Sequence, residues 1–200
     1  IALISIIVGL GLTELARSLR ELVRPSRQVR WHWLPLLWAA NLFLLILQLW
    51  WTSFRVLQQD VFQSALGFLP YALLFVGLYL LCAFALPDEE WTGHASDAGA
   101  SADEVLDLES FYFSAAHRHW FFGTHIALLI FSQFINAMVT LSQGDPNLGS
   151  LANAIGVNVG IAAVLGVLLV SERHILHGAA ALSTFGVVLY SLAAWVAPIG

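Results

Sequence analysis

The sequence has no lysine, one cysteine and few charges of either sign, with charged residues at only 10% of its 200 positions. A typical soluble domain carries about 25% charged residues, so this chain has too few to cover a water-facing surface of its size. The lone Cys82 excludes an internal disulfide and any metal site built from several cysteines. The net charge of −5 comes mostly from one loop and says little about partners. No DNA-binding motif is present, so we expect no nucleic-acid partner.

Long runs without Asp, Glu, Lys or Arg take up most of the chain. Each is continuously apolar and long enough to cross the hydrocarbon core, which needs roughly 20 residues, and none alternates as a barrel strand does. The sequence therefore predicts an all-α fold, a polytopic transmembrane helical bundle forming one integral membrane domain over residues 1–200. We expect six spans, at about 1–23, 32–53, 65–87, 117–142, 150–171 and 176–198.

The eight arginines predict the orientation of the bundle, because cytoplasmic loops are enriched in basic residues. Threading six spans places seven of them on one side and only Arg55 on the other. We therefore expect the arginine-rich first loop to be cytoplasmic and both termini to be periplasmic, in a bacterial inner membrane. The seven are Arg17, Arg20, Arg24, Arg27, Arg30, Arg118 and Arg173.

The start of the chain does not resemble a cleaved signal peptide, because the charges follow the apolar residues 1–13 instead of preceding them. The first residue is Ile1 and not Met, so we expect further residues before it.

The loop at 88–109 holds eight acidic residues and no basic ones, so it too is predicted to be cytoplasmic and its first half mobile. Its second half differs, since Ser101 and Glu104 have the spacing of a capping box. Val105, Leu108 and Tyr112 then share one helical face. The pattern predicts a short amphipathic helix on the cytoplasmic membrane interface, leading into the fourth span.

Two ionisable residues fall within or at the edge of the first span. Glu14 lies about 20 Å from the chain start at 1.5 Å per residue, and Arg17 is one turn further on. Ionisable groups at such depth usually face the bundle interior and pair. They form either an internally paired ladder continuing to Glu21 or part of a substrate or proton site.

The fourth and fifth spans contain polar side chains that lipid cannot satisfy. They act either as interhelical hydrogen bonds or as the lining of a solute or ion path. The candidates are His125, Ser132, Gln133, Asn136 and Thr140 on the fourth span and Asn153 and Asn158 on the fifth.

Six of the seven histidines map to the cytoplasmic third of the threaded bundle, and the seventh, His94, lies in the acidic loop. His174 and His177 share a helical face, and Glu172 and Glu14 are the carboxylates that can join them. Imidazole and carboxylate ligands suit zinc or iron. No metalloenzyme signature such as HExxH is present, so we predict no cofactor and keep this zinc or iron site as an alternative; haem is not expected.

The segment Gly156-Val-Asn-Val-Gly160 is a GxxxG element in the fifth span. Two glycines one turn apart allow a second helix to approach closely. They predict helix packing within the fold or in a homo-oligomer.

Two segments resemble a family of uncharacterised bacterial inner-membrane proteins. The first is IIVGLGLTELARSLREL with the following VRWHWLPLLWAANLFLLILQLWW, and the second is LESFYFSAAHRHWFFG after the acidic loop. The resemblance covers most of the first 125 residues and implies an inner-membrane location without a known activity. Ser110 stands where the family often has a histidine, which argues against a histidine-based mechanism.

Three functions remain open from the sequence. The first is a small-solute or ion transporter or channel with a polar path between helices. The second is an accessory, scaffold or sensing subunit of a larger membrane complex, since no catalytic motif is present. The third is a membrane metalloenzyme with a cytoplasmic His/Glu site. The expected partners are the lipid bilayer and either further copies of the chain or other membrane subunits.

Overall fold

A computed structural model describes residues 2–24, 28–88, 105–143 and 146–196. Over these residues the chain is a helical bundle, and six of its helices are long and apolar enough to cross a membrane. The predicted all-α fold with six spans is therefore confirmed. The six are α1 (Ala2–Val23), α2 (Trp33–Val56), α3 (Ala65–Phe84), α5 (Ala115–Leu141), α6 (Leu148–Val170) and α7 (His174–Val196).

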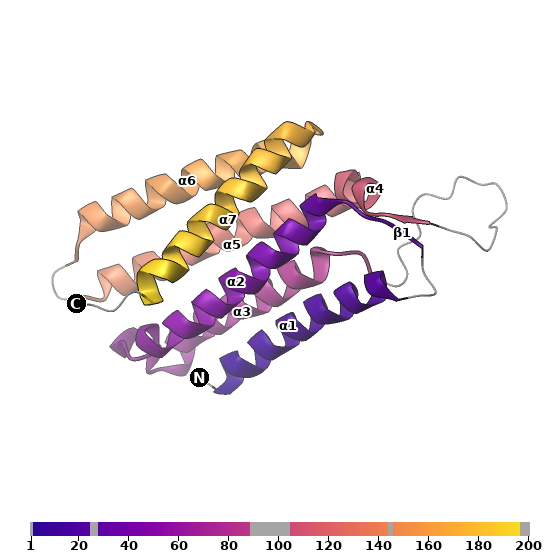
Figure 1. Ribbon diagram of the computed structural model, residues 1–200. Coiled ribbons are helices and arrows are strands. Elements are labelled where there is room, and N and C mark those ends of the chain that lie inside the picture. Colours follow the sequence, from indigo (N-terminus) through magenta and orange to yellow (C-terminus); the bar gives the residue numbers. More distant parts are fainter. Residues whose placement is uncertain (1, 25–27, 89–104, 144–145, 197–200) are drawn as a thin grey trace.

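The helices run roughly along one common direction, with α6 and α7 on one side of the bundle and α1 on the other (Figure 1). Helix α1 packs mainly against α3 and α2, α3 packs against α5, and α6 packs mainly against α5. Helix α7 completes the bundle by packing on α2. We use "arginine-rich end" for the end where α1, α3 and α6 finish and α2, α5 and α7 begin; α1 begins and α7 finishes at the opposite end.

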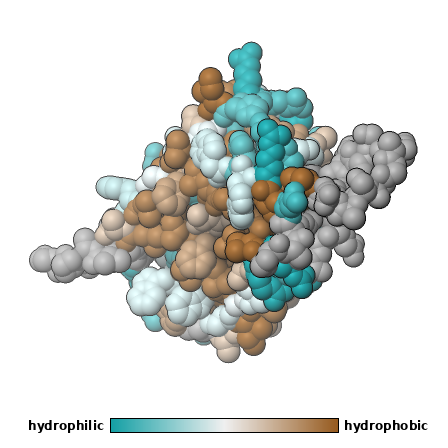
Figure 2. Space-filling model, turned by 45° about the vertical axis from the view of Figure 1, so that its right-hand side comes forward, coloured by the Kyte–Doolittle hydropathy of each residue, from teal (hydrophilic) through white to brown (hydrophobic). Residues whose placement is uncertain are grey.

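The bundle buries large rings and aliphatic side chains inside and leaves many others on its outer surface. Trp38, Phe75 and Leu81 are at most 1% exposed, whereas Leu66 and Ile175 are more than 80% exposed. Large exposed apolar residues on every span are what a bundle surrounded by lipid requires. Figure 2 is turned so that the arginine-rich end comes forward, and hydrophilic side chains are visible there between the apolar ones.

A two-stranded ribbon joins the first loop to the end of the acidic loop. Strand β1 (Val29–Arg30) pairs in parallel with β2 (Leu106–Asp107), and Arg30 Nη1 lies 3.1 Å from Asp107 Oδ2. The ribbon brings the two oppositely charged loops to the same end of the bundle, as the threading of six spans predicts.

The short helix before the fourth span exists, but it begins later than the capping box predicts. Helix α4 (Leu108–Phe113) is capped by Asp107, whose Oδ1 accepts from the backbone N–H groups of Glu109 and Ser110. Ser101 and Glu104 lie outside the described residues, and Val105 precedes the helix. The helix packs against α2 and α5, with Leu108 and Tyr112 fully buried in the bundle.

The predicted span limits differ from the observed ones by a few residues. The third span ends at Phe84 and not at Pro87, and a short 3-10 helix, η1 (Asp60–Phe62), precedes it. The fourth and sixth begin two residues earlier than predicted, at Ala115 and His174. Gly144 and Asp145, between the fourth and fifth spans, lie outside the described residues.

Candidate functional site

A chain of hydrogen bonds crosses the bundle interior just below the arginine-rich end. Trp38 Nε1 lies 2.9 Å from Tyr112 Oη, which lies 2.9 Å from His177 Nδ1. His177 Nε2 lies 2.9 Å from the Ser171 carbonyl oxygen. Trp38, Tyr112 and His177 are at most 1% exposed.

The chemistry of the two end groups fixes the direction of every bond in this chain. An indole N–H can only donate and a carbonyl oxygen can only accept. Trp38 therefore donates to Tyr112, and His177 donates to the Ser171 carbonyl from Nε2. His177 Nδ1 is then left to accept the hydroxyl proton of Tyr112. Both ring nitrogens of His177 are occupied in a single neutral tautomer.

The Tyr112 hydroxyl is held in its protonated form by the same surroundings. Burial raises the pKa of this hydroxyl well above its ordinary value, and the hydrogen bond from Trp38 opposes that rise only in part. Tyr112 can therefore donate to His177 over the whole physiological pH range.

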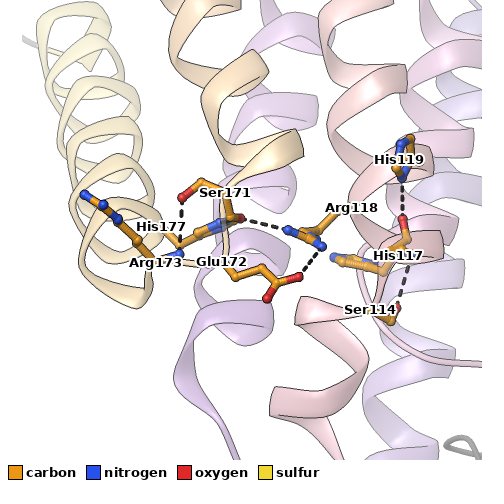
Figure 3. A network of polar contacts seen from close by, with 9 residues as sticks. Ser114, His117, Arg118, His119, Ser171, Glu172, Arg173 and His177 are labelled. Atoms are coloured by element: carbon orange, nitrogen blue, oxygen red, sulfur yellow. Dashed lines mark hydrogen bonds and ion pairs between the residues drawn. The ribbon is translucent and has the colours of Figure 1, made fainter.

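Arg118 attaches the start of α5 to the link between α6 and α7 (Figure 3). Its Nη1 donates to the Ser171 carbonyl at 2.9 Å, and its Nη2 lies 2.7 Å from Glu172 Oε1. The Arg118 side chain is 9% exposed, whereas that of Glu172 is 71% exposed. A buried guanidinium is thus neutralised by a carboxylate at the surface, and Ser171 accepts from both Arg118 and His177.

A second group of polar residues lies nearer the surface of the same end. His32 immediately precedes α2, Glu109 lies in the first turn of α4, and His174 is the first residue of α7. One ligand atom from each of the three lies within 4.8 Å of the others. His174 Nδ1 is 3.6 Å from Glu109 Oε1, and the rings of His32 and His174 are 6.3 Å apart.

The metal set suggested by the sequence does not assemble as one group. Of the four residues in that predicted set, only His174 lies in a cluster of metal-ligating side chains within the described residues. The other members of this cluster are His32 and Glu109. His177 uses both nitrogens in hydrogen bonds, and Glu172 pairs with Arg118. Glu14 is half-buried on α1, which packs mainly on α3 and α2.

The charge ladder expected in the first span also has different partners. Glu21 is 5% exposed and forms ion pairs with Arg20 at 2.9 Å and Arg24 at 3.0 Å. Arg17 is exposed, and within the described residues no ion pair joins it to Glu14. Glu21 therefore pairs with Arg20 and Arg24, and not through Arg17 with Glu14 as the predicted ladder requires.

The polar residues of α5 are half-buried, and their hydrogen bonds lie largely within the helix. Ser132 donates to the Leu129 carbonyl, and Gln133 Nε2 lies 3.4 Å from Ser132 Oγ. Asn136 and Thr140 are half-buried as well. On α6, Asn158 bonds to the Ala154 carbonyl of its own helix and Asn153 is exposed.

Five buried polar atoms on the spans have no hydrogen-bond partner among the described residues, and two of them, His117 Nε2 and Arg118 Nε, lie in the first turn of α5. The three that lie deeper are His125 Nδ1 and Gln133 Oε1 on α5 and Asn41 Oδ1 on α2. Asn41 is 2% exposed and donates its amide N–H to the Ala181 carbonyl of α7. Sequence reasoning missed Asn41, although an amide in the apolar run of the second span, one of two there with Gln48, was a signal that could have identified it.

The three atoms are spread over much of the depth of the bundle. At 1.5 Å per residue, Asn41 and His125 lie about 12 and 15 Å along their helices from the arginine-rich end. Gln133 lies about 27 Å along α5 by the same measure. Trp38 covers His125 at that end, with their ring centroids 6.0 Å apart, and Phe121 and Phe122 pack on Trp38.

The glycines of the GxxxG element are not covered by another helix of the described chain. A Cβ placed at Gly156 or Gly160 would meet nothing within 4 Å. Close helix approach occurs instead at Gly11, where a Cβ would lie 3.0 Å from Ile46 Cδ1, and at Gly77, where it would meet Leu128.

Comparison with known proteins gives no match to a family model, to a curated protein or to a solved structure.

Proposed function

We propose that the protein provides a passage through the membrane for protons or for a small solute that donates hydrogen bonds. The observation that supports this function is the set of partnerless polar atoms at Asn41, His125 and Gln133. A polar atom buried in hydrocarbon without a partner costs several kcal/mol, so a stable bundle needs water or a polar solute beside each one.

The chemistry of these atoms narrows the class of solute. The oxygens of Asn41 and Gln133 are amide carbonyls, which only accept hydrogen bonds. Their partners must carry N–H or O–H groups or be small cations. Water, hydronium and ammonium meet this requirement, whereas anions do not.

Large rings close the passage toward the arginine-rich end. Trp38, Phe121 and Phe122 are at most 1% exposed, and their centroids lie within 5.7 Å of one another. Tyr112 holds the Trp38 indole in place through its hydroxyl. We infer that this conformation is closed and that conduction requires the Trp38 ring to move.

The passage is tested by reconstituting the purified protein in liposomes and following the flux of protons with a trapped pH dye and of ammonium with a light-scattering assay. We expect Asn41→Leu and Gln133→Leu to lower the flux about tenfold or more. Asn153→Leu is the matched control, because Asn153 is exposed on α6. The proposal fails if wild-type liposomes are no more permeable than empty ones, or if all three variants behave like the wild type.

For the orientation, we propose a bacterial inner membrane with the arginine-rich end in the cytoplasm and both termini in the periplasm. The support is the distribution of arginine, with seven of eight residues on one side of the threaded chain. The ion pair between Arg30 and Asp107 agrees with both charged loops occupying the same compartment.

An accessory role in a larger membrane complex is the second candidate, and α6 supports it. Leu165 and Leu168 are the buried residues of this helix, while Gly156 and Gly160 lie uncovered on its outer face. Two small residues one turn apart on a lipid-facing surface allow another helix to pack closely. Native mass spectrometry of gently extracted protein distinguishes the outcomes: fixed stoichiometry with other chains supports this role, and a monomer contradicts it.

A further inference from the structure

We propose that His32, Glu109 and His174 form a binding site for a divalent first-row transition metal, with zinc as the best match. This inference is independent of the proposed passage, because none of the three residues lies among Asn41, His125 and Gln133.

Three elements from distant parts of the sequence bring the ligands together. The extended backbone of His32, with φ −135° and ψ 137°, leads into α2, and its side chain caps no helix N–H group. The Asp107 cap fixes the first turn of α4, which carries Glu109. The hydrogen bond of His177 to the Ser171 carbonyl fixes the first turn of α7, which carries His174. Each ligand is therefore held by a structured backbone.

The His32 side chain has a feature that a purely structural role does not explain. Its Nδ1 is buried and has no hydrogen-bond partner within the described residues. A buried imidazole nitrogen without a partner is costly, and coordination of a metal ion would satisfy it. No hydrogen bond within the described part of the chain does so.

The donor set matches zinc in type and number. Two imidazoles and one carboxylate are the ligands of catalytic zinc sites of the His₂Glu kind, which keep a further position for water. Zn–N and Zn–O bonds of about 2.0–2.2 Å place tetrahedral ligands about 3.3 Å apart. The three ligand atoms already lie within 4.8 Å, so small side-chain rotations complete the site.

The exposure of two of the ligands allows those rotations and gives an ion access. The Glu109 side chain is 40% exposed and that of His174 is 56% exposed. Phe113 packs 4.3 Å from the His174 ring and 6.4 Å from the His32 ring, and so forms an apolar wall behind the site. The apolar wall lowers the local dielectric constant, and this strengthens the attraction of the Glu109 carboxylate for a cation.

The nearby guanidinium groups do not compete strongly with a cation for Glu109. Arg30 pairs with Asp107, and Arg118 pairs with Glu172. Arg173, next to His174 in the chain, is exposed and points away from His177 in Figure 3. The contact of Glu109 with His174, 3.6 Å between Oε1 and Nδ1, is long for a hydrogen bond and does not occupy the carboxylate.

The test is a titration of the purified full chain, carried on a tag without histidine, with Co²⁺ as a visible probe for zinc. We expect one Co²⁺ per chain, with absorption between about 500 and 650 nm, displaced by stoichiometric Zn²⁺. His32→Gln, Glu109→Gln and His174→Gln should each weaken binding about 30-fold or more. His119→Gln is the matched control, because His119 is an exposed histidine at the same end of α5.

A second measurement separates loss of the site from loss of the fold. Zn²⁺ should raise the melting temperature of the wild type and of His119→Gln, reversibly with a chelator, and leave the three ligand variants unchanged. Equal melting temperatures of all proteins without metal show that the variants fold. The proposal is overturned if the wild type binds no metal, or if His32→Gln binds as tightly as the wild type, which would reduce the cluster to a contact between Glu109 and His174.

Discussion

At the scale of single residues, the Tyr112 hydroxyl is the central group of the buried hydrogen-bond chain. It accepts from Trp38 and donates to His177 where all three side chains are buried. Replacing it with phenylalanine keeps the ring but leaves an indole N–H and an imidazole nitrogen without partners. Each such group costs about 1–3 kcal/mol.

Tyr112→Phe should therefore lower the thermal stability of the purified protein by about 2 kcal/mol or more. Tyr190→Phe is the matched control, since Tyr190 is 77% exposed and its loss should leave the melting temperature unchanged. Circular dichroism on heating in detergent measures both. Equal melting temperatures for the two variants would show that the hydrogen-bond chain adds nothing to stability.

The same residue gives a pH prediction. Because burial raises the pKa of Tyr112 in the folded protein, the unfolded chain loses this proton first as the pH passes its ordinary value of 10.0. The contribution of Tyr112 to stability is thus present below that pH and declines above it. Up to pH 11, tyrosinate absorbance should have the same amplitude in the wild type and in Tyr112→Phe. A smaller amplitude in the variant would mean that the hydroxyl is accessible.

The sequence predicted which residues gather at the arginine-rich end but not which atoms meet. Threading alternating spans brings His32, His174 and His177 to one end, because each helix start or end must fall there. The partners of Tyr112 are 74 and 65 positions away in the chain. Whether His177 faces Tyr112 or a metal depends on the rotation of α7 about its axis, which the apolar pattern of a lipid-surrounded helix leaves open.

At the scale of elements, the first turn of α3 contains the glycine with the least room for a side chain among the described glycines. A Cβ at Gly67 would lie 1.8 Å from the backbone oxygen of Val61, and the Gly67 N–H donates to the Ser64 cap. The obstacle is backbone, so no side-chain rotation relieves it. The loop through η1 therefore returns against α3 only because this position has no side chain.

Gly67→Ala should destabilise the protein by several kcal/mol, as judged by its melting temperature, because η1 would have to move. Gly156→Ala is the control, since a Cβ there meets nothing within 4 Å. Helix propensity alone predicts the same gain of about 1 kcal/mol for both substitutions. A result in which both variants are equally stable would contradict the close contact at Gly67.

The spans were predictable because bilayer thickness and charge-free runs set their length. The start of α4 was not, since it depends on the Asp107 cap and on the pairing of β2 with β1, a contact between segments far apart in the sequence. The GxxxG pattern was likewise a poor guide to packing within the chain. Close approach occurs at isolated glycines such as Gly77, whose neighbour Leu128 lies on another span.

At the scale of the whole molecule, α1 begins and α7 finishes at the end opposite the charged loops (Figure 1). An even number of spans places the start of the first and the end of the last on the same side of any membrane. Which end faces the cytoplasm depends on the arginine distribution, because basic residues near the spans are retained on that side during insertion. The proposed orientation therefore depends on charge and not on the helix packing.

Single cysteines test this orientation with little background, because the native Cys82 is buried with 1% of its surface exposed. Gln28 and Gln143 are both exposed, the first beside the arginine-rich loop and the second after α5 at the opposite end. In intact bacterial cells with a permeabilised outer membrane, a membrane-impermeant maleimide should label Gln143→Cys and not Gln28→Cys. Disrupting the inner membrane should make both reactive, which serves as the control for accessibility. Labelling of Gln28→Cys alone in intact cells would reverse the orientation, and would place the proposed metal site of His32, Glu109 and His174 in the periplasm.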